Sequence, residues 1–135
     1  MSALPPIAAT LYVAIGGAVG AAVRYSLGRG MTAMAGPRVM DAFPWATLTA
    51  NVAGSLAMGV LVGWLARQGD GGESWRLLLG VGLLGGFTTF SSFSIEMLGL
   101  IERGQAGLAM IYAAVSVAAG LGALYLGLIG IRATA

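Results

Sequence analysis

Residues 85–94 read Gly-Gly-Phe-Thr-Thr-Phe-Ser-Ser-Phe-Ser, and they lie inside an apolar stretch long enough to cross a membrane. Five of these ten residues carry hydroxyl groups, and phenylalanine recurs at every third position. Polar side chains and irregular backbone are tolerated at membrane depth only where they are buried in protein or line a polar cavity. The segment therefore indicates a membrane fold, and it is the expected place where the protein acts on a solute.

The composition of the chain supports this interpretation. Of its 135 residues, 58% are hydrophobic and only 9% are charged, whereas soluble domains carry about 25% charged residues. Four apolar stretches are each close to the roughly 20 residues that cross a bilayer core. We expect an all-α membrane protein with a single domain over residues 1–135 and four transmembrane helices, at approximately 7–27, 45–66, 77–101 and 106–131. Because four helices do not easily enclose a pore, a homo-oligomer is expected.

Several classes of function are disfavoured by the residues that are absent. The sequence has no cysteine and no histidine, which excludes disulfides, zinc sites and imidazole catalysis. No two acids are expected at the same membrane depth, so we do not expect an enzyme. Seven basic residues against five acidic ones do not indicate a nucleic-acid partner. Residues 1–6 lack the basic start of a signal peptide, and we expect the first apolar stretch to be retained as a helix.

Glycine and proline positions predict how the helices pack and where they end. Residues 28–44 contain Gly-Pro and Phe-Pro steps and are expected to form a loop. Three pairs of glycines have the four-residue spacing that lets helices approach closely, namely Gly16/Gly20, Gly59/Gly63 and Gly82/Gly86. Gly85-Gly86, next to Thr88-Thr89, is the best candidate for a break in the third helix at mid-membrane. The carbonyl groups freed there need a partner, which a hard cation such as Na⁺ would supply.

The arginines are almost evenly divided between the two predicted sides of the membrane. With both termini on one side, that side holds Arg67, Arg76 and Arg132, and the other holds Arg29, Arg38 and Arg103, with Arg24 near a helix end. An excess of Lys and Arg in the cytoplasmic loops normally fixes orientation. Without it, the chain either inserts in both orientations, which can pair as an antiparallel dimer, or has one weakly specified orientation.

Two polar residues inside predicted helices have two interpretations each. Glu96 is the only acid well inside a helix, and an embedded carboxylate suggests a transport role, although a packing role explains it equally well. Asn51 lies about two turns into the second predicted helix. Its amide either forms a bond between helices or lines a pathway.

Phe90 and Phe93 are three residues apart and share a helix face. Lipid contact or core packing is the usual role of such a pair, but here Ser91-Ser92 lies between the two rings. Aromatic rings have electropositive edges, and hydroxyl groups and the Asn51 amide are hydrogen-bond donors. Together they suit a small anion without a fixed positive charge that would retain it. Arg24 either extends to the membrane interface or contacts a permeating ion.

Three motifs, in order along the chain, resemble those of the Fluc fluoride channels, also called the CrcB family. The first is Gly16-Gly17-Ala18-Val19-Gly20-Ala21 followed by Arg24-Tyr25. The second is Thr49-Ala50-Asn51-Val52-Ala53-Gly54, and the third is Gly-Gly-Phe-Thr-Thr-Phe-Ser-Ser-Phe at residues 85–93. With the four-helix length, the resemblance covers nearly the whole chain.

The resemblance implies an antiparallel, dual-topology homodimer in the inner or plasma membrane of a bacterium. It implies two pathways through which fluoride leaves passively, which lowers cytoplasmic fluoride, and a central structural Na⁺ bound by the backbone carbonyls of Gly85 and Thr88 from both subunits. It places Arg24 in a structural or vestibule role. The matching pathway positions are Asn51, Thr89, Phe90, Ser92, Phe93, Glu96, Tyr112 and Ser116.

Two positions depart from the family pattern, and one alternative function is kept. Ser92 stands where the family usually has threonine, which preserves the hydroxyl group. Gly120 stands where some members have serine, so the residues that line that end of the pathway are not assigned. The alternative is a small dual-topology exporter that exchanges protons for cationic compounds. Such a protein needs a carboxylate in its first helix, where this chain has only Arg24 as a charged residue.

Overall fold

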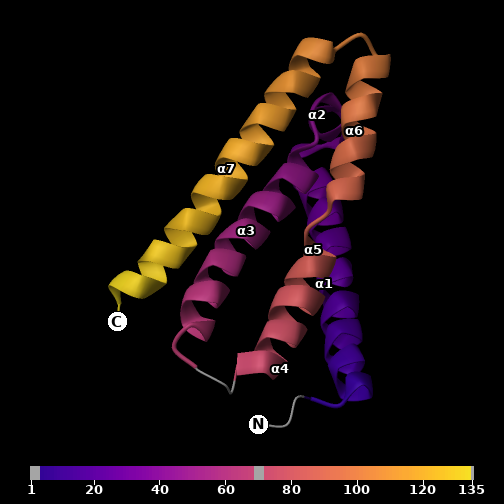
Figure 1. Ribbon diagram of the computed structural model, residues 1–135. Helices are drawn as coiled ribbons and strands as arrows, with labels where there is room; N and C mark the ends of the chain where they lie inside the picture. Colours follow the sequence, from indigo (N-terminus) through magenta and orange to yellow (C-terminus); the bar gives the residue numbers. More distant parts are fainter. Residues whose placement is uncertain (1–3, 69–71, 135) are drawn as a thin grey trace.

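The computed structural model describes residues 4–68 and 72–134, and within them it contains helices and no strand. Four helical segments are long and apolar enough to cross a membrane: Pro6–Ala35, Trp45–Leu65, Glu73–Glu102 and Ala106–Ala133. The prediction of an all-helical chain with four apolar helices is confirmed. In chain order the elements are α1 (Pro6–Ala35), α2 (Pro37–Ala42), α3 (Trp45–Leu65), α4 (Glu73–Trp75), η2 (Arg76–Leu84), α5 (Gly85–Phe87), α6 (Phe90–Glu102) and α7 (Ala106–Ala133) (Figure 1).

The long helices run side by side, and successive ones run in opposite directions (Figure 1). α1 begins and α7 ends at the same end of the bundle, while α2 and the turn between α6 and α7 lie at the other end. This agrees with the expectation that both termini share a side. The balanced arginines therefore lie at the two ends in the way that the sequence predicts.

Glycines bring the backbones of α1 and the third span into direct contact. A Cβ atom added at Gly16 would overlap the carbonyl oxygen of Leu78, and one at Gly20 would overlap that of Leu83. In return, a Cβ atom at Gly82 would lie 2.8 Å from the carbonyl oxygen of Val13. Helices approach this closely only where small residues face each other, so the predicted packing role of these glycines is confirmed.

The same device joins α3 to α7. A Cβ atom at Gly59 would overlap the carbonyl oxygen of Leu124, and one at Gly127 would overlap that of Leu56. The bundle is thus built from two glycine-packed pairs, α1 with η2 and α5, and α3 with α7.

The predicted loop at 28–44 is wrong. α1 continues as far as Ala35, and Gly36, with φ +86°, ends it while its N–H donates to the carbonyl oxygen of Thr32. Pro37 then starts α2, because proline at the first helical position has no N–H to leave unpaired. The loop was predicted from the Gly-Pro and Phe-Pro steps, but these steps mark only the two short interruptions at Gly36 and at Phe43-Pro44, and the residues between them are helical.

The third span is less regular than predicted. Residues 76–84 form a π-helix, which the sequence did not indicate. Gly85 and Gly86, where a break was predicted, are helical, and the extended residues are Thr88 (φ −84°, ψ 157°) and Thr89 (φ −154°, ψ 121°). Threonine is β-branched and accepts extended backbone readily, whereas Gly86 stays helical at its contact with Gly17 of α1. The start and end of the predicted helix, 77 and 101, differ little from the observed 73 and 102.

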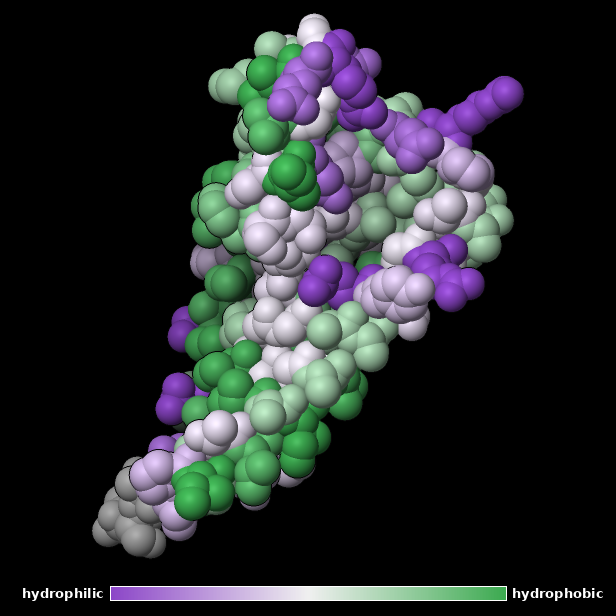
Figure 2. All heavy atoms as spheres, turned by 90° about the vertical axis from the view of Figure 1, so that its right-hand side faces the viewer, coloured by the Kyte–Doolittle hydropathy of each residue, from purple (hydrophilic) through white to green (hydrophobic). Residues whose placement is uncertain are grey.

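The outer surface of the single chain is largely apolar. Many large apolar side chains are exposed, among them Ile7, Met34, Phe90 and Leu121. Figure 2 shows hydrophobic residues over the lower part of one face and hydrophilic residues gathered towards its upper end. Such a surface suits contact with lipid or with a second membrane helix rather than with water.

Candidate functional site

Asn51 of α3 binds the backbone of Thr89, in the extended segment between α5 and α6. The Asn51 Nδ2 donates to the Thr89 carbonyl oxygen at 3.2 Å, and the Thr89 N–H donates to the Asn51 Oδ1 at 2.8 Å. An interrupted helix leaves backbone groups without partners, and each must be satisfied away from water. Asn51 supplies both a donor and an acceptor to one residue. Of the two roles expected for Asn51, the structure therefore shows the hydrogen bond between helices.

Thr89 also caps the N-terminus of α6. Its Oγ1 accepts a hydrogen bond from the backbone N–H of Ser92 at 3.1 Å, which is the usual bond of an N-cap side chain. The hydroxyl oxygens of Ser91 and Ser92 lie 3.1 and 3.3 Å from the same Oγ1. The predicted pathway residues Thr89 and Ser92 are therefore neighbours in a small hydroxyl cluster.

Glu96 of α6 is held by hydroxyl groups from two other helices. Thr47 of α3 donates to Oε1 at 2.6 Å, and Tyr112 of α7 donates to Oε2 at 2.8 Å. Thr47 is 8% exposed and Tyr112 is completely buried. Because both side chains are packed in the protein, the two hydroxyl donors hold the carboxylate in one position. Thr47 was missed in the sequence, although it lies one turn before Asn51, a spacing that puts both on one face of α3.

Aromatic rings continue from this cluster towards the chain surface. The ring centroids of Phe93 and Tyr112 are 5.0 Å apart, and those of Phe90 and Phe93 are 5.6 Å apart. Phe90 is 79% exposed in the single chain. One turn along α7 from Tyr112, the buried Oγ of Ser116 has no hydrogen-bond partner in the described residues. The structure thus brings Phe90, Phe93, Tyr112 and Glu96 together, with Ser116 one turn away.

Arg24 of α1 reaches the same interruption from the other side. Its Nε donates to the carbonyl oxygen of Gly86 at 3.3 Å, where a cation is favourable because the carbonyls at a helix C-terminus carry partial negative charge. The Thr88 hydroxyl donates to the carbonyl oxygen of Leu84 at 2.9 Å. Within the described residues, the carbonyl oxygens of Gly85 and Thr88 accept no hydrogen bond, and no cluster of acids could hold a metal ion. A cation at this place would need backbone oxygens as ligands.

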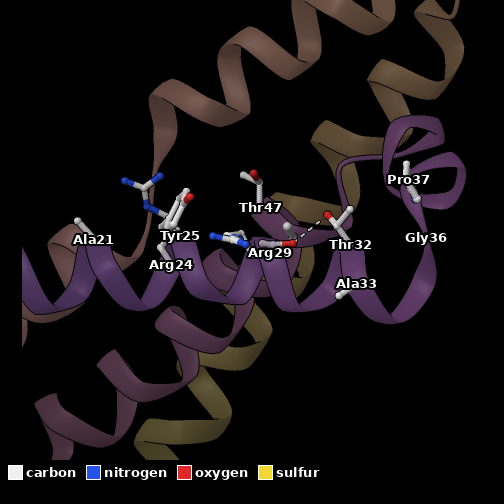
Figure 3. A pocket seen from close by; sticks show the side chains of 11 residues that line it. Ala21, Arg24, Tyr25, Arg29, Thr32, Ala33, Gly36, Pro37 and Thr47 are labelled. Atoms are coloured by element: carbon white, nitrogen blue, oxygen red, sulfur yellow. Dashed lines mark hydrogen bonds between the residues drawn. The ribbon is translucent and has the colours of Figure 1, made fainter.

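Three cavities border these residues. The largest, of about 1000 Å³, is lined by Arg24, Tyr25 and Arg29 of α1 and by Thr47 of α3, and in Figure 3 the three α1 side chains stand on the same side of the helix. The Arg29 guanidinium lies 5.9 Å from the centroid of the Tyr25 ring. A cavity of about 290 Å³ is lined by Asn51, Ser55, Thr88, Thr89 and Phe90 among others, and one of about 440 Å³ by Asp41, Glu96, Glu102 and Arg103 among others.

Comparison with known proteins identifies the family. The family described as "CrcB-like protein, Camphor Resistance (CrcB)" matches residues 11–128. The chain belongs to this family. The resemblance that the three motifs indicated is therefore confirmed, and four apolar helices in a CrcB-like chain make it a multi-pass membrane protein.

Its relatives in the CrcB-like family cover almost the same length. A protein of Novosphingobium aromaticivorans named "Fluoride-specific ion channel FluC" is 60% identical over 127 residues, which cover 94% of this chain and 98% of the relative. Proteins with the same name from Erythrobacter litoralis and Sphingopyxis alaskensis are 54% identical over 129 residues and 55% identical over 120 residues. They span 95% and 89% of this chain, and 95% and 92% of their own lengths.

Proposed function

We propose that this protein is a channel, not an enzyme, through which fluoride leaves the cytoplasm of a bacterium passively across the cell membrane. The observation that carries the proposal is the continuous line of aromatic rings and polar groups formed by Phe90, Phe93, Tyr112 and Glu96, here called the anion line. The ion is identified from the name of its relatives, "Fluoride-specific ion channel FluC".

The chemistry of the anion line suits a small, strongly hydrated anion. Such an ion leaves water only if donors replace its hydration shell at little net cost. The electropositive edges of Phe90 and Phe93 supply such donors, and the hydroxyl groups of Ser92 and Ser116 add to them. The hydroxyl protons of Tyr112 and Thr89 are already donated, to Glu96 and to Ser92, so these two residues shape the pathway and orient its donors. The second N–H of Asn51 adds another, because its amide nitrogen has two hydrogens and one bond to Thr89.

The channel works as an antiparallel homodimer with two pathways. Phe90 is 79% exposed in the single chain, so a second copy is needed to enclose the pathway at that ring. The arginines at the two ends of the bundle are balanced, which allows both orientations in one membrane. C-terminal reporters that fluoresce or act on only one side of the membrane should register both orientations. A single orientation would contradict the dual-topology part of the proposal.

A structural Na⁺ would be held by the carbonyl oxygens of Gly85 and Thr88 from both subunits, where it would neutralise the partial negative charge of the interrupted helix. These oxygens accept no hydrogen bond in the part of the chain that the structure describes, whereas the Gly86 oxygen between them is bonded to Arg24. Carbonyl oxygens of an interrupted helix are suitable ligands for a hard cation. Arg24 and Na⁺ would then share the exposed carbonyls of α5 without competing for the same oxygen.

Fluoride efflux from liposomes that contain only the purified protein tests the function. Liposomes loaded with potassium fluoride and treated with a potassium ionophore should release fluoride to an electrode, while liposomes loaded with chloride should retain it. Efflux from protein-free liposomes gives the background. Loss of the difference between protein and background would overturn the proposed function.

A further inference from the structure

The aromatic rings that contact one another continue beyond Tyr112. The ring centroid of Phe43 lies 5.3 Å from that of Tyr112 in an edge arrangement, with an angle of 76° between the ring planes. Beyond it, the ring of Trp45 lies 4.6 Å from Phe43. Five rings from three parts of the chain are therefore in contact one after another, in the order Phe90, Phe93, Tyr112, Phe43 and Trp45.

Phe43 is held in place by the local structure around it. It is extended (φ −153°, ψ 144°) and follows α2 directly, as expected for a residue before proline. The carbonyl oxygen of Phe43 accepts a hydrogen bond from the Trp45 N–H at 2.8 Å. Two residues before Phe43, the Asp41 carbonyl oxygen accepts a hydrogen bond from Nη1 of Arg103 at 3.1 Å, while Nε of the same arginine donates to the Gly99 oxygen at 3.2 Å. α2 is thus tied to the C-terminal part of α6.

Tyr112 is the residue that joins this segment to the rest of the anion line. It is completely buried, its hydroxyl donates to Glu96, and its ring contacts both Phe93 and Phe43. The ring packs in a core with Leu100 and Ala109, and in a close-packed interior the loss of one neighbouring ring leaves room for the side chain to shift. The hydroxyl oxygen lies on the axis of ring rotation, so it moves only when the whole side chain swings about χ1. A small swing of that kind is enough to lengthen its bond to Glu96.

We propose that Phe43 is a positioning residue, which holds the Tyr112 ring so that its hydroxyl stays bonded to Glu96. α2 and the turn between α6 and α7 lie at the same end of the bundle (Figure 1), and Arg103 of that turn bonds the Asp41 carbonyl oxygen, two residues before Phe43. Phe43 therefore couples this turn to the anion line. This inference rests on the proposed fluoride function and adds a residue that makes no contact with the ion. α2, which was predicted as part of a loop, would thus support conduction by holding Phe43.

The first test separates the ring of Phe43 from its apolar volume. Phe43→Tyr and Phe43→Trp keep a ring, whereas Phe43→Leu and Phe43→Met keep only apolar volume. We expect the ring variants to retain most of the fluoride efflux rate. The other two should lose up to about tenfold, no more than the loss expected when a ring edge of the anion line itself is removed. Equal efflux through all four variants, each purified as a dimer, would overturn the proposal.

The second test asks whether Phe43 acts through Tyr112. If it does, Phe43→Leu should have no further effect on efflux in a Tyr112→Phe background, since the hydroxyl to be positioned is already absent. Leu108→Ala is the matched control, because Leu108 packs on the same core of Leu100, Ala109 and Tyr112 and has no ring. Its effect should be the same in both backgrounds. An equal effect of Phe43→Leu in both backgrounds would mean that Phe43 only fills the core. If the unmodified protein released no fluoride, the proposed function would fail before either comparison.

Discussion

The two halves of the third span contact their neighbours differently. The first half is η2 with α5, and the second half is α6. The first half packs on α1 through backbone atoms and glycines, with Gly82 and Gly86 against the α1 backbone. The second half makes its contacts through side chains: Phe93 against Tyr112, and Glu96 bonded to Thr47 and Tyr112. Two extended threonines separate the halves.

The difference suggests a division of labour within one span. Backbone contact at glycines fixes the distance between helices and leaves no side chain for chemistry. The second half is free of such close contact, because a Cβ atom added at its glycine, Gly99, would meet nothing within 4 Å. Its face is therefore available for hydroxyl groups, rings and a carboxylate. The first half locates the site, and the second half supplies its chemistry.

The largest effect should come from adding one methyl group to the first half's contact with α1. Gly20→Ala would place a Cβ atom on the Leu83 carbonyl oxygen, and a backbone atom has no rotamer by which to avoid it. We expect a destabilisation of about 3 kcal/mol or more, the upper end of the usual cost of overpacking, and a large loss of purified dimer. Thermal unfolding monitored by size-exclusion chromatography measures both.

The control for Gly20→Ala lies in another membrane helix. Gly122 of α7 has nothing within 4 Å of an added Cβ atom, so Gly122→Ala should leave yield and stability close to those of the unmodified protein. Equal losses in the two variants would show that glycine content, and not close approach, is what the fold requires.

A second prediction addresses the extended residues Thr88 and Thr89 between the two halves, here called the joint. Asn51→Leu removes the donor and the acceptor that bind Thr89, and it leaves a half-buried N–H and a half-buried C=O unpaired. Because both groups are only half-buried, each should cost the lower end of the roughly 1–3 kcal/mol for an unsatisfied group, and we expect a loss of about 2 kcal/mol in the free energy of unfolding. Asn51→Gln keeps an amide donor and an amide acceptor on a longer side chain, so its loss in thermal stability should be smaller. A normal stability for Asn51→Leu would contradict the role of Asn51 in holding the joint.

A third prediction compares phenylalanines from the two halves. Phe90→Ile and Phe93→Ile remove an electropositive ring edge from the anion line, and an edge interaction of about 1–1.5 kcal/mol corresponds to about tenfold in rate. Fluoride efflux should fall by that factor while the protein still purifies as a dimer. Phe87 of α5 lies against Gly54 of α3 and has no place in the line. Phe87→Ile should cost about 1 kcal/mol of stability and keep most of the efflux. Three equal losses of efflux would mean that packing explains all three rings.

The sequence predicted the first half of this comparison better than the joint. The four spans and the role of Gly16, Gly20 and Gly82 follow from apolar length and four-residue spacing, which are local patterns. The position of the extended residues does not follow from such patterns. Gly85-Gly86 has the weaker helix propensity, but Gly86 packs against Gly17 of α1 and both glycines are helical, so the extended residues are Thr88 and Thr89.

Residues that act through a distant partner were also missed. Thr47 and Phe43 belong to the site only because α3, α6 and α7 converge there, and Thr47 lies 49 positions from Glu96. Spacing on one helix could have indicated Thr47, which is one turn from Asn51, but no local signal indicates Phe43. The roles predicted for the anion-line residues and for Gly85 and Thr88 stay predictions, which the efflux experiments address.

The smallest effect should come from the cation at the joint. If Na⁺ at a concentration near its dissociation constant is replaced by a large organic cation, the bound state loses about 0.4 kcal/mol, or about a factor of two in population. Fluoride efflux should fall by about this factor if Na⁺ has the proposed structural role at the carbonyls of Gly85 and Thr88. Its direction should follow the fluoride gradient whichever side holds more Na⁺. Efflux that reverses with the Na⁺ gradient would instead indicate a coupled transporter, and the joint would then belong to the chemistry of the span rather than to its framework. The division between a half that locates the site and a half that conducts would fail at the threonines that connect them.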